Sequence, residues 1–184
     1  MGYTRMTIWV EGPDDVRFFE RIIKPIVHRS YDFVEVRPYA TLKDSKLIGF
    51  IHSIDSVAQS PGIRYDYILQ RDLDDAPCFT EARSRWAVRI PCCKPGRIVV
   101  PKGEIEAWYL GGVAPTQCNA LGIQCIGNTD GITKESFNAL IPKRFSSRID
   151  FMNELLRSYD IDLATANNAS FHYLIRDFLP RICA

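Results

Sequence analysis

Three groups of acidic residues each follow a short apolar run in the N-terminal part of the chain. The groups are Glu11 with Asp14 and Asp15, Asp72 with Asp74, and Glu104 with Glu106. Carboxylates held close together repel one another unless a cation or a proton lies between them. Their oxygens are the hard ligands that Mg²⁺ and Mn²⁺ prefer, and such an ion can orient water for attack on a phosphate. These residue types therefore point to metal-assisted phosphoryl chemistry.

The spacing of Asp72-Leu73-Asp74 supports this interpretation, because residues two apart in a strand point to the same face. A simpler interpretation is a solvated acidic turn, since Asp75 comes next. Near the N-terminus, Asp14 follows Pro13 and is expected to cap a helix, where the dipole favours acidic groups. Capping does not account for Glu11, which precedes the turn.

Strand and helix patterns alternate through the first 112 residues. Strands are predicted over 6–10, 33–39, 66–74 and 97–101, and helices over about 14–26, 43–58, 77–86 and from about 104 onward. This alternation predicts an α/β domain with a mostly parallel four-stranded sheet flanked by helices. Reactive groups of such sheets lie at the carboxyl ends of the strands, so all three acidic groups are expected at one edge.

The pattern changes after Gly111 and Gly112. A Gly-, Asn- and Thr-rich stretch is followed by three short segments with helical periodicity. Thr133, Ser147 and Asn168 are plausible helix-start residues for these segments. The predicted layout is a catalytic domain over 1–112 and a small C-terminal helical region over 113–184, packed on or beside it.

Composition narrows the class of protein. The chain has 184 residues, 46% of them hydrophobic and 24% charged, which suits a globular domain with a real core. The net charge of +1 gives no general attraction for nucleic acid and leaves only a local basic patch to bind it. No apolar run approaches the roughly 20 residues that span a bilayer, and the N-terminus lacks a signal-peptide pattern. A cytoplasmic location without a membrane partner is expected.

The cysteines do not form a metal-binding pattern. They stand at positions 78, 92, 93, 118, 125 and 183, so no CxxC pair occurs, and the three histidines are not in ligand spacing. In a cytoplasmic protein, isolated cysteines are most often buried or incidental thiols. We therefore expect thiols and not a zinc site or a disulfide.

Two motifs carry a resemblance to a known family. The run Val10-Glu11-Gly12-Pro13-Asp14-Asp15, followed by Asp72-Leu73-Asp74, resembles the Toprim domain. This metal-binding catalytic fold is shared by topoisomerases, bacterial primases, small RNA-processing nucleases and OLD-family nucleases. The resemblance covers roughly the first 112 residues. The run KGEIEAWYL over 102–110 is similar to the "IEAWLL" segment of small stand-alone Toprim-like proteins, many of which occur near genome-defence genes.

The resemblance implies roles for the first two acidic groups. Glu11 corresponds to the Toprim glutamate, which acts as a metal ligand or a general base. Asp72 and Asp74 correspond to the metal-binding pair. Asp15 matches a second acidic position that OLD-type nucleases use for a metal. The implied cofactor is Mg²⁺ or Mn²⁺.

The third group has weaker counterparts in the OLD-type subgroup. Lys102 resembles its late lysine, which would stabilise charge on a phosphate in the transition state. Glu104 resembles its late acidic ligand, and Glu106 is the alternative. Residues two apart on a helix point about 200° away from each other, so only one of the two glutamates can face the site.

The chain also departs from several Toprim proteins. Topoisomerases need a nucleophilic tyrosine on a separate domain, and Tyr109 is expected to be a packing residue. The extra catalytic region of primases has no counterpart here. OLD nucleases usually carry an ATPase domain ahead of the Toprim domain, and no GxxxxGK[ST] motif of such a domain occurs in this sequence. A partner ATPase or another defence-system protein that acts in trans stays an open alternative.

Several cations near the acidic groups are candidates for holding the phosphates of a nucleic acid. They are Arg71, Lys94, Arg97, Lys143, Arg144 and Arg148. The alternative for the last three is a solvated helix face.

The first hypothesis is a metal-dependent Toprim-type nuclease that hydrolyses phosphodiester bonds of DNA or RNA in genome defence or repair. The second is a non-catalytic or partner-dependent Toprim module of a defence complex. The third is a small-molecule phosphotransferase or phosphatase, which ranks last because the haloacid-type phosphatases carry their D-x-D after strand one.

Overall fold

The structure is a computed structural model that describes residues 2–73 and 76–184. Its contacts divide the chain into two compact units, one formed by the described residues up to Val100 with Leu179–Ala184, the other by Pro101–Phe178. The first unit thus ends before the boundary at residue 112 that the sequence suggests, and the last residues of the chain return to it. In the described part of the chain, no helix has the length and apolar character of a membrane span.

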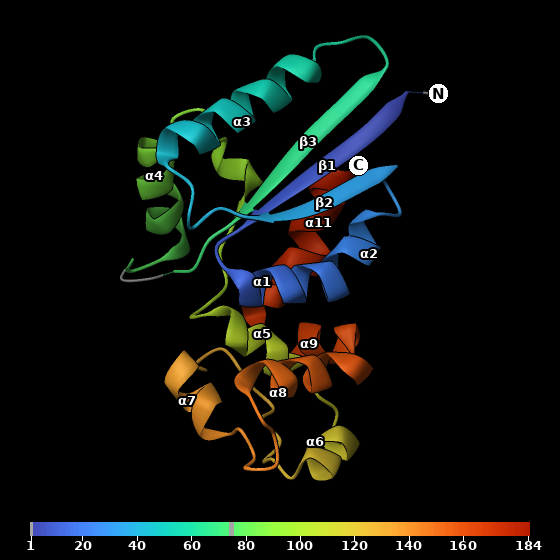
Figure 1. The fold of residues 1–184 in the computed structure, drawn as a ribbon, viewed down its shortest axis with the longest axis vertical. Coiled ribbons are helices and arrows are strands. Elements are labelled where there is room, and N and C mark those ends of the chain that lie inside the picture. Colours follow the sequence, from blue (N-terminus) through green and yellow to red (C-terminus); the bar gives the residue numbers. More distant parts are fainter. Residues whose placement is uncertain (1, 74–75) are drawn as a thin grey trace. The chain divides into compact units, whose positions relative to one another are not determined.

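The first unit is built on a four-stranded, all-parallel sheet, which confirms the predicted fold class (Figure 1). Its strands are β1 (Tyr3–Val10), β2 (Phe33–Pro38), β3 (Ile63–Gln70) and β4 (Ile98–Val99), in the order β2-β1-β3-β4. β1 and β3 are therefore neighbours at the centre of the sheet. Toward the carboxyl ends of both strands, consecutive side chains are buried, as expected for central parallel strands covered on both faces.

Helices cover both faces of this sheet (Figure 1). One face carries α1 (Pro13–Phe18), a π-helical turn (Phe19–Ile23) and α2 (Lys24–Val27), and the other carries α3 (Asp44–Val57) and α4 (Phe79–Arg89). The π turn lies just before Pro25, which has no N–H and whose ring would clash with a carbonyl one turn earlier in a regular α-helix. Trp9, Leu69, Ile51 and Trp86 belong to one buried cluster between the sheet and the second pair of helices.

The connections after β1 and β3 leave the sheet toward opposite faces. β1 continues into α1, whereas β3 leads to α4 on the other side (Figure 1). In an open parallel sheet, the place where neighbouring strands part in this way leaves a crevice at their carboxyl ends. Glu11 follows β1 and Asp72 follows β3, so both residues lie at the place where the sequence predicts metal ligands.

Two local predictions were wrong. β3 ends at Gln70 and not at residue 74, because its partner β4 offers only Ile98 and Val99 for pairing. Asp72 therefore lies beyond the strand, and the strand alternation invoked for the D-x-D motif does not apply. The N-cap of α1 is Gly12 and not Asp14, whose carboxylate instead lies 2.7 Å from Nη1 of Arg17.

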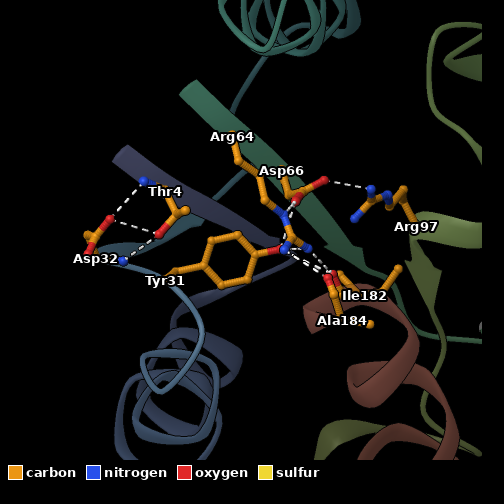
Figure 2. Close-up of polar contacts among 8 residues, drawn as sticks. All are labelled: Thr4, Tyr31, Asp32, Arg64, Asp66, Arg97, Ile182 and Ala184. Carbon is orange, nitrogen blue, oxygen red and sulfur yellow. Dashed lines mark hydrogen bonds and ion pairs between the residues drawn. The ribbon is translucent and has the colours of Figure 1, made fainter. Parts of the chain in front are cut away.

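The C-terminal segment α11 (Leu179–Cys183) is tied to the first unit by a polar network (Figure 2). Arg64 donates to main-chain oxygens of Ile182 and Ala184 at 2.8 and 2.9 Å. The Tyr31 hydroxyl also donates to Ile182 O, at 3.1 Å, and to Oδ2 of Asp66, at 2.7 Å. Asp66 lies at the centre of the network, because it accepts from both Arg64 and Arg97 as well.

The second unit is helical. Its α-helices are α5 (Ile105–Gly111), α6 (Pro115–Leu121), α7 (Lys134–Ala139), α8 (Arg148–Leu155), α9 (Ile161–Asn167) and α10 (Ala169–Tyr173). Thr133, Ser147 and Asn168 cap α7, α8 and α10 through their side chains, as predicted. The core contains Trp108 and Tyr109, both fully buried, so these aromatic residues are packing residues.

Cys118 and Cys125 form a disulfide in this unit, which corrects the expectation of thiols for this pair. α6 is followed by Gly122, whose positive φ of 71° allows the N–H of Ile123 to donate to Cys118 O at 3.0 Å. This turn reverses the chain and brings the two cysteines to a Cα separation of 5.5 Å. Such a reversal is not visible in their spacing.

Candidate functional site

The ends of β1 and β3 bring Glu11 and Asp72 together. The main-chain N–H of Asp72 donates to Oε2 of Glu11 at 3.3 Å, and both side chains are half-buried. The two carboxyl-bearing residues come from segments far apart in sequence, and the parallel pairing of β1 with β3 places them side by side. This is the strongest agreement between the sequence-based site and the structure.

Gln70, which sequence reasoning missed, joins these two residues. Its side chain is fully buried, with Oε1 accepting from the N–H of Glu11 at 3.1 Å and Nε2 donating to Oδ1 of Asp72 at 3.1 Å. One amide thus fixes the main chain at the end of β1 and the carboxylate beyond β3. The sequence signal for Gln70 was its polar side chain directly after the apolar run Tyr67-Ile68-Leu69.

Asp15 is positioned by the start of α1. Its carboxylate is buried, and Oδ2 accepts from the N–H of Gly12 at 2.8 Å. This is the hydrogen bond that an acidic residue at the third helical position makes to the N-cap. Asp15 therefore has a structural task in the turn that follows Glu11.

Tyr39 adds a buried hydroxyl next to these carboxylates. It follows β2, its side chain is 6% exposed, and its hydroxyl has no hydrogen-bond partner among the described residues. Burial raises the pKa of Tyr39 well above its usual value, and the negative charges of Glu11, Asp72 and Asp15 raise it further. Tyr39 consequently keeps its proton and can donate it to an acceptor oxygen.

The third acidic group, Glu104 with Glu106, lies in the second unit together with Lys102, and each of these side chains has a partner there. Nζ of Lys102 lies 2.8 Å from Oδ2 of Asp130. Glu104 is the N-cap residue of α5, and its carboxylate accepts from the main-chain N–H of Lys134. Glu106 is 4% exposed and is paired with Arg148. Glu106 thus contributes to the packing of its own unit, and Glu104 connects two of its helices.

Most cations proposed to hold phosphates make contacts within their own unit. Lys94 lies 3.3 Å from Asp55, and Arg97 lies 2.6 Å from Asp66. The guanidinium of Arg71 lies over the ring of Trp86, 4.6 Å from its centroid.

In the second unit, Arg144 donates to the main-chain oxygen of Ala120 at 2.9 Å, and Arg148 is the partner of Glu106. Lys143 is exposed. Of this unit's three proposed phosphate contacts, two therefore have roles in folding.

The donor set at the β1–β3 edge suits a hard divalent cation. Mg²⁺ is usually held by one or two carboxylates and keeps several waters, which matches Glu11 and Asp72. Among the described residues, no three His, Cys, Asp or Glu side chains are grouped closely enough to hold an ion. Asp74, the second aspartate of the D-x-D motif, lies outside the described residues. Glu11 and Asp72 are thus the two candidate ligands whose positions the structure describes.

No family model matches the chain, and the comparisons with curated proteins and with solved structures found no match either.

Proposed function

We propose that this chain is a divalent-metal-dependent Toprim-type nuclease that hydrolyses phosphodiester bonds of DNA or RNA. One observation carries the proposal. Glu11 and Asp72 meet at the carboxyl edge of a parallel sheet, between strands whose connections leave toward opposite faces, and one buried amide holds both. This is the position at which open parallel sheets bind their ligands, and the donors are those that Mg²⁺ and Mn²⁺ prefer.

In this proposal, Glu11 and Asp72 hold the ion, and Asp74 completes the set of aspartates. The ion, when bound, supplies positive charge that polarises a phosphate and orients a water molecule. Gln70 keeps the main chain of Glu11 and the carboxylate of Asp72 in position, as outer partners of metal ligands do. The protonated Tyr39 hydroxyl donates to an oxygen at the site. The Toprim resemblance gives Lys102 the task of stabilising charge on the phosphate.

The test is cleavage of end-labelled single-stranded DNA, double-stranded DNA and single-stranded RNA with Mg²⁺ or Mn²⁺. Wild type is compared with Glu11→Gln and Asp72→Asn, and binding of Mn²⁺ to each protein is measured by calorimetry. Asp14→Asn is the matched control, because this aspartate lies three residues after Glu11 and its carboxylate pairs with Arg17. We expect both ligand variants to lose cleavage and most of the Mn²⁺ affinity, and the control to keep both.

Other outcomes separate the alternatives. Cleavage that survives in Glu11→Gln and Asp72→Asn would overturn the proposed site. Binding of Mn²⁺ through these residues without cleavage would favour the non-catalytic or partner-dependent Toprim module. The internal pairing of Lys94, Arg97 and Arg148 supports that alternative, because it leaves fewer cations available for nucleic acid. Absence of both metal binding and cleavage would exclude the metal centre.

A further inference from the structure

A cavity lies on the α3 face of the first unit, and none of its lining residues belongs to the proposed metal site. It has a volume of about 180 Å³ and is lined by alternate residues of β1 and β2, by Tyr65 of β3 and by one side of α3. Pockets for drug-sized ligands occupy roughly 300–1,000 Å³, so this cavity suits a smaller molecule. Its lining combines a cationic group with aromatic rings, and each part indicates a property of the ligand.

One positive charge is in excess at the cavity. Arg5 and Arg37 both contact Glu35, at 2.6 and 2.8 Å, so two guanidinium groups share one carboxylate. Burial raises the pKa of Glu35, but hydrogen bonds from Arg5, Arg37 and Thr7 outweigh burial and hold the pKa below its usual value. The carboxylate therefore stays ionised, and the three groups together carry a charge of +1. An anionic ligand would balance that charge.

The position of Arg5 is fixed by two aromatic rings. The register places Arg5 between Phe33 of β2 and Tyr65 of β3, and its guanidinium carbon lies 4.9 Å from both ring centroids. These cation–π contacts hold the group in one orientation at the cavity wall. A pre-positioned cation loses little freedom when a ligand binds.

The remaining wall is mostly apolar. The rings of Trp9 and Phe50 lie 5.3 Å apart at 33°, and Ile54 and Val57 continue this surface along α3. A flat ring would cover these side chains with good contact, whereas a flexible polar chain would not.

From this combination we propose that the cavity binds a small planar anion, a ring that carries a carboxylate or a phosphate. The anionic group contacts Arg37 and Arg5, and the ring lies against Trp9 and Phe50. Aromatic carboxylic acids and nucleoside monophosphates share this chemistry.

Calorimetric titration of the full chain in EDTA tests the proposal. The probes are indole-3-carboxylate and uridine 5′-monophosphate, with inorganic phosphate as the ring-free control and uridine as the uncharged one. We expect at least one ringed anion to bind more tightly than phosphate and uridine. EDTA removes divalent ions, and Glu11→Gln should bind the same anion equally well, so the result does not depend on the nuclease proposal.

Single-residue variants test whether the anion binds in this cavity. Arg37→Gln should weaken binding about tenfold or more, because a hydrogen bond to a charged group is lost. Arg29→Gln changes an exposed arginine away from the cavity and should have no effect.

The result identifies the ligand class or rejects the site. Binding of the carboxylate alone or of the nucleotide alone selects between the two sources of the anion. Binding of neither at millimolar concentration would overturn the proposal. Equal effects of Arg37→Gln and Arg29→Gln would do the same.

Discussion

The acidic residues of the two units are held in opposite ways. In the first unit, Gln70 and main-chain N–H groups position Glu11 and Asp72, and both side chains keep part of their surface in solvent. In the second unit, Glu106 is buried against the guanidinium of Arg148. Neutral donors orient a carboxylate without cancelling its charge, whereas a buried cation cancels it.

The elements that carry these residues explain the difference. Glu11 and Asp72 come directly after central strands, where the main chain leaves the sheet and the side chains reach its edge. Glu106 lies in the first turn of α5, a short helix whose residues are all buried. A glutamate in that helix must bring its own counter-charge. The edge of the sheet is therefore the better place for a metal ligand.

The largest effect on stability is expected from Glu106→Gln, which removes the carboxylate partner of Arg148. Breaking a buried ion pair costs about 3–5 kcal/mol of stability. Because Arg148 is partly exposed, we expect the free energy of unfolding to fall by about 3 kcal/mol. Glu11→Gln should change the free energy of unfolding by less than about 1 kcal/mol. Urea unfolding followed by circular dichroism measures both. Equal losses would remove the distinction between the two kinds of carboxylate.

A double variant gives the control for that experiment. Glu106→Gln combined with Arg148→Met removes both charges, and well-packed apolar replacements of buried ion pairs are often neutral or stabilising. The double variant should therefore recover part of the loss.

Replacing Gln70 by Leu should cause the next largest effect, at the edge of the sheet. The change leaves the N–H of Glu11 without its acceptor and costs about 2 kcal/mol. It also frees the carboxylate of Asp72 from Nε2, so the affinity for Mn²⁺ should fall about tenfold. Urea unfolding and calorimetry measure the two effects. Gln59→Leu, at an exposed position, is the control. Unchanged Mn²⁺ affinity would show that Gln70 does not position the ligands.

The fold was largely predictable because its signals are local. Apolar runs and helical spacing located the four strands and most helices, and Thr133, Ser147 and Asn168 were recognised as helix caps from single residues. The parallel sheet then placed Glu11 and Asp72 at a common edge without knowledge of their contacts.

The remaining features depend on partners distant in sequence. Gln70 is a bridge only because β1 and β3 pair, and the end of β3 is set by the short β4. The partner of Glu106 stands 42 positions later in the chain, so a motif around Glu106 does not contain it. Sequence patterns locate elements, but they do not say which side chains neutralise one another.

Asp66 extends the comparison, because it belongs to the first unit but has cationic partners like those of Glu106. Burial raises the pKa of Asp66. Hydrogen bonds from Tyr31 and Arg64 and the charge of Arg97 outweigh burial, so the pKa of Asp66 lies below its usual value. As the pH falls, Asp66 is therefore protonated at a higher pH in the unfolded chain than in the folded chain. The contribution of Asp66 to stability is present above the unfolded pKa of about 3.9 and is lost as the pH falls through the lower folded pKa.

The measurement is the free energy of unfolding of wild type and Asp66→Asn as a function of pH. At neutral pH the variant should be less stable by about 1.5 kcal/mol, the value of a hydrogen bond to a charged group. Below the unfolded pKa this difference should shrink, since wild type is then also protonated. A difference that stays constant down to the acid limit would show that the charge of Asp66 does not stabilise the fold. Asp177→Asn, at an exposed position, is the control.

The smallest effect on stability is expected from Lys102→Gln. Lys102 is 47% exposed and pairs with Asp130 at 2.8 Å, and surface pairs of this kind contribute about 0–1 kcal/mol. If Lys102 stabilises charge on the phosphate, as the Toprim resemblance implies, its loss should slow cleavage by about 10²–10³-fold. Asp130→Asn breaks the same ion pair but keeps the lysine, so it should match the stability change and retain cleavage. A variant that folds and cleaves normally without Lys102 would confine the catalytic groups to the edge of the sheet.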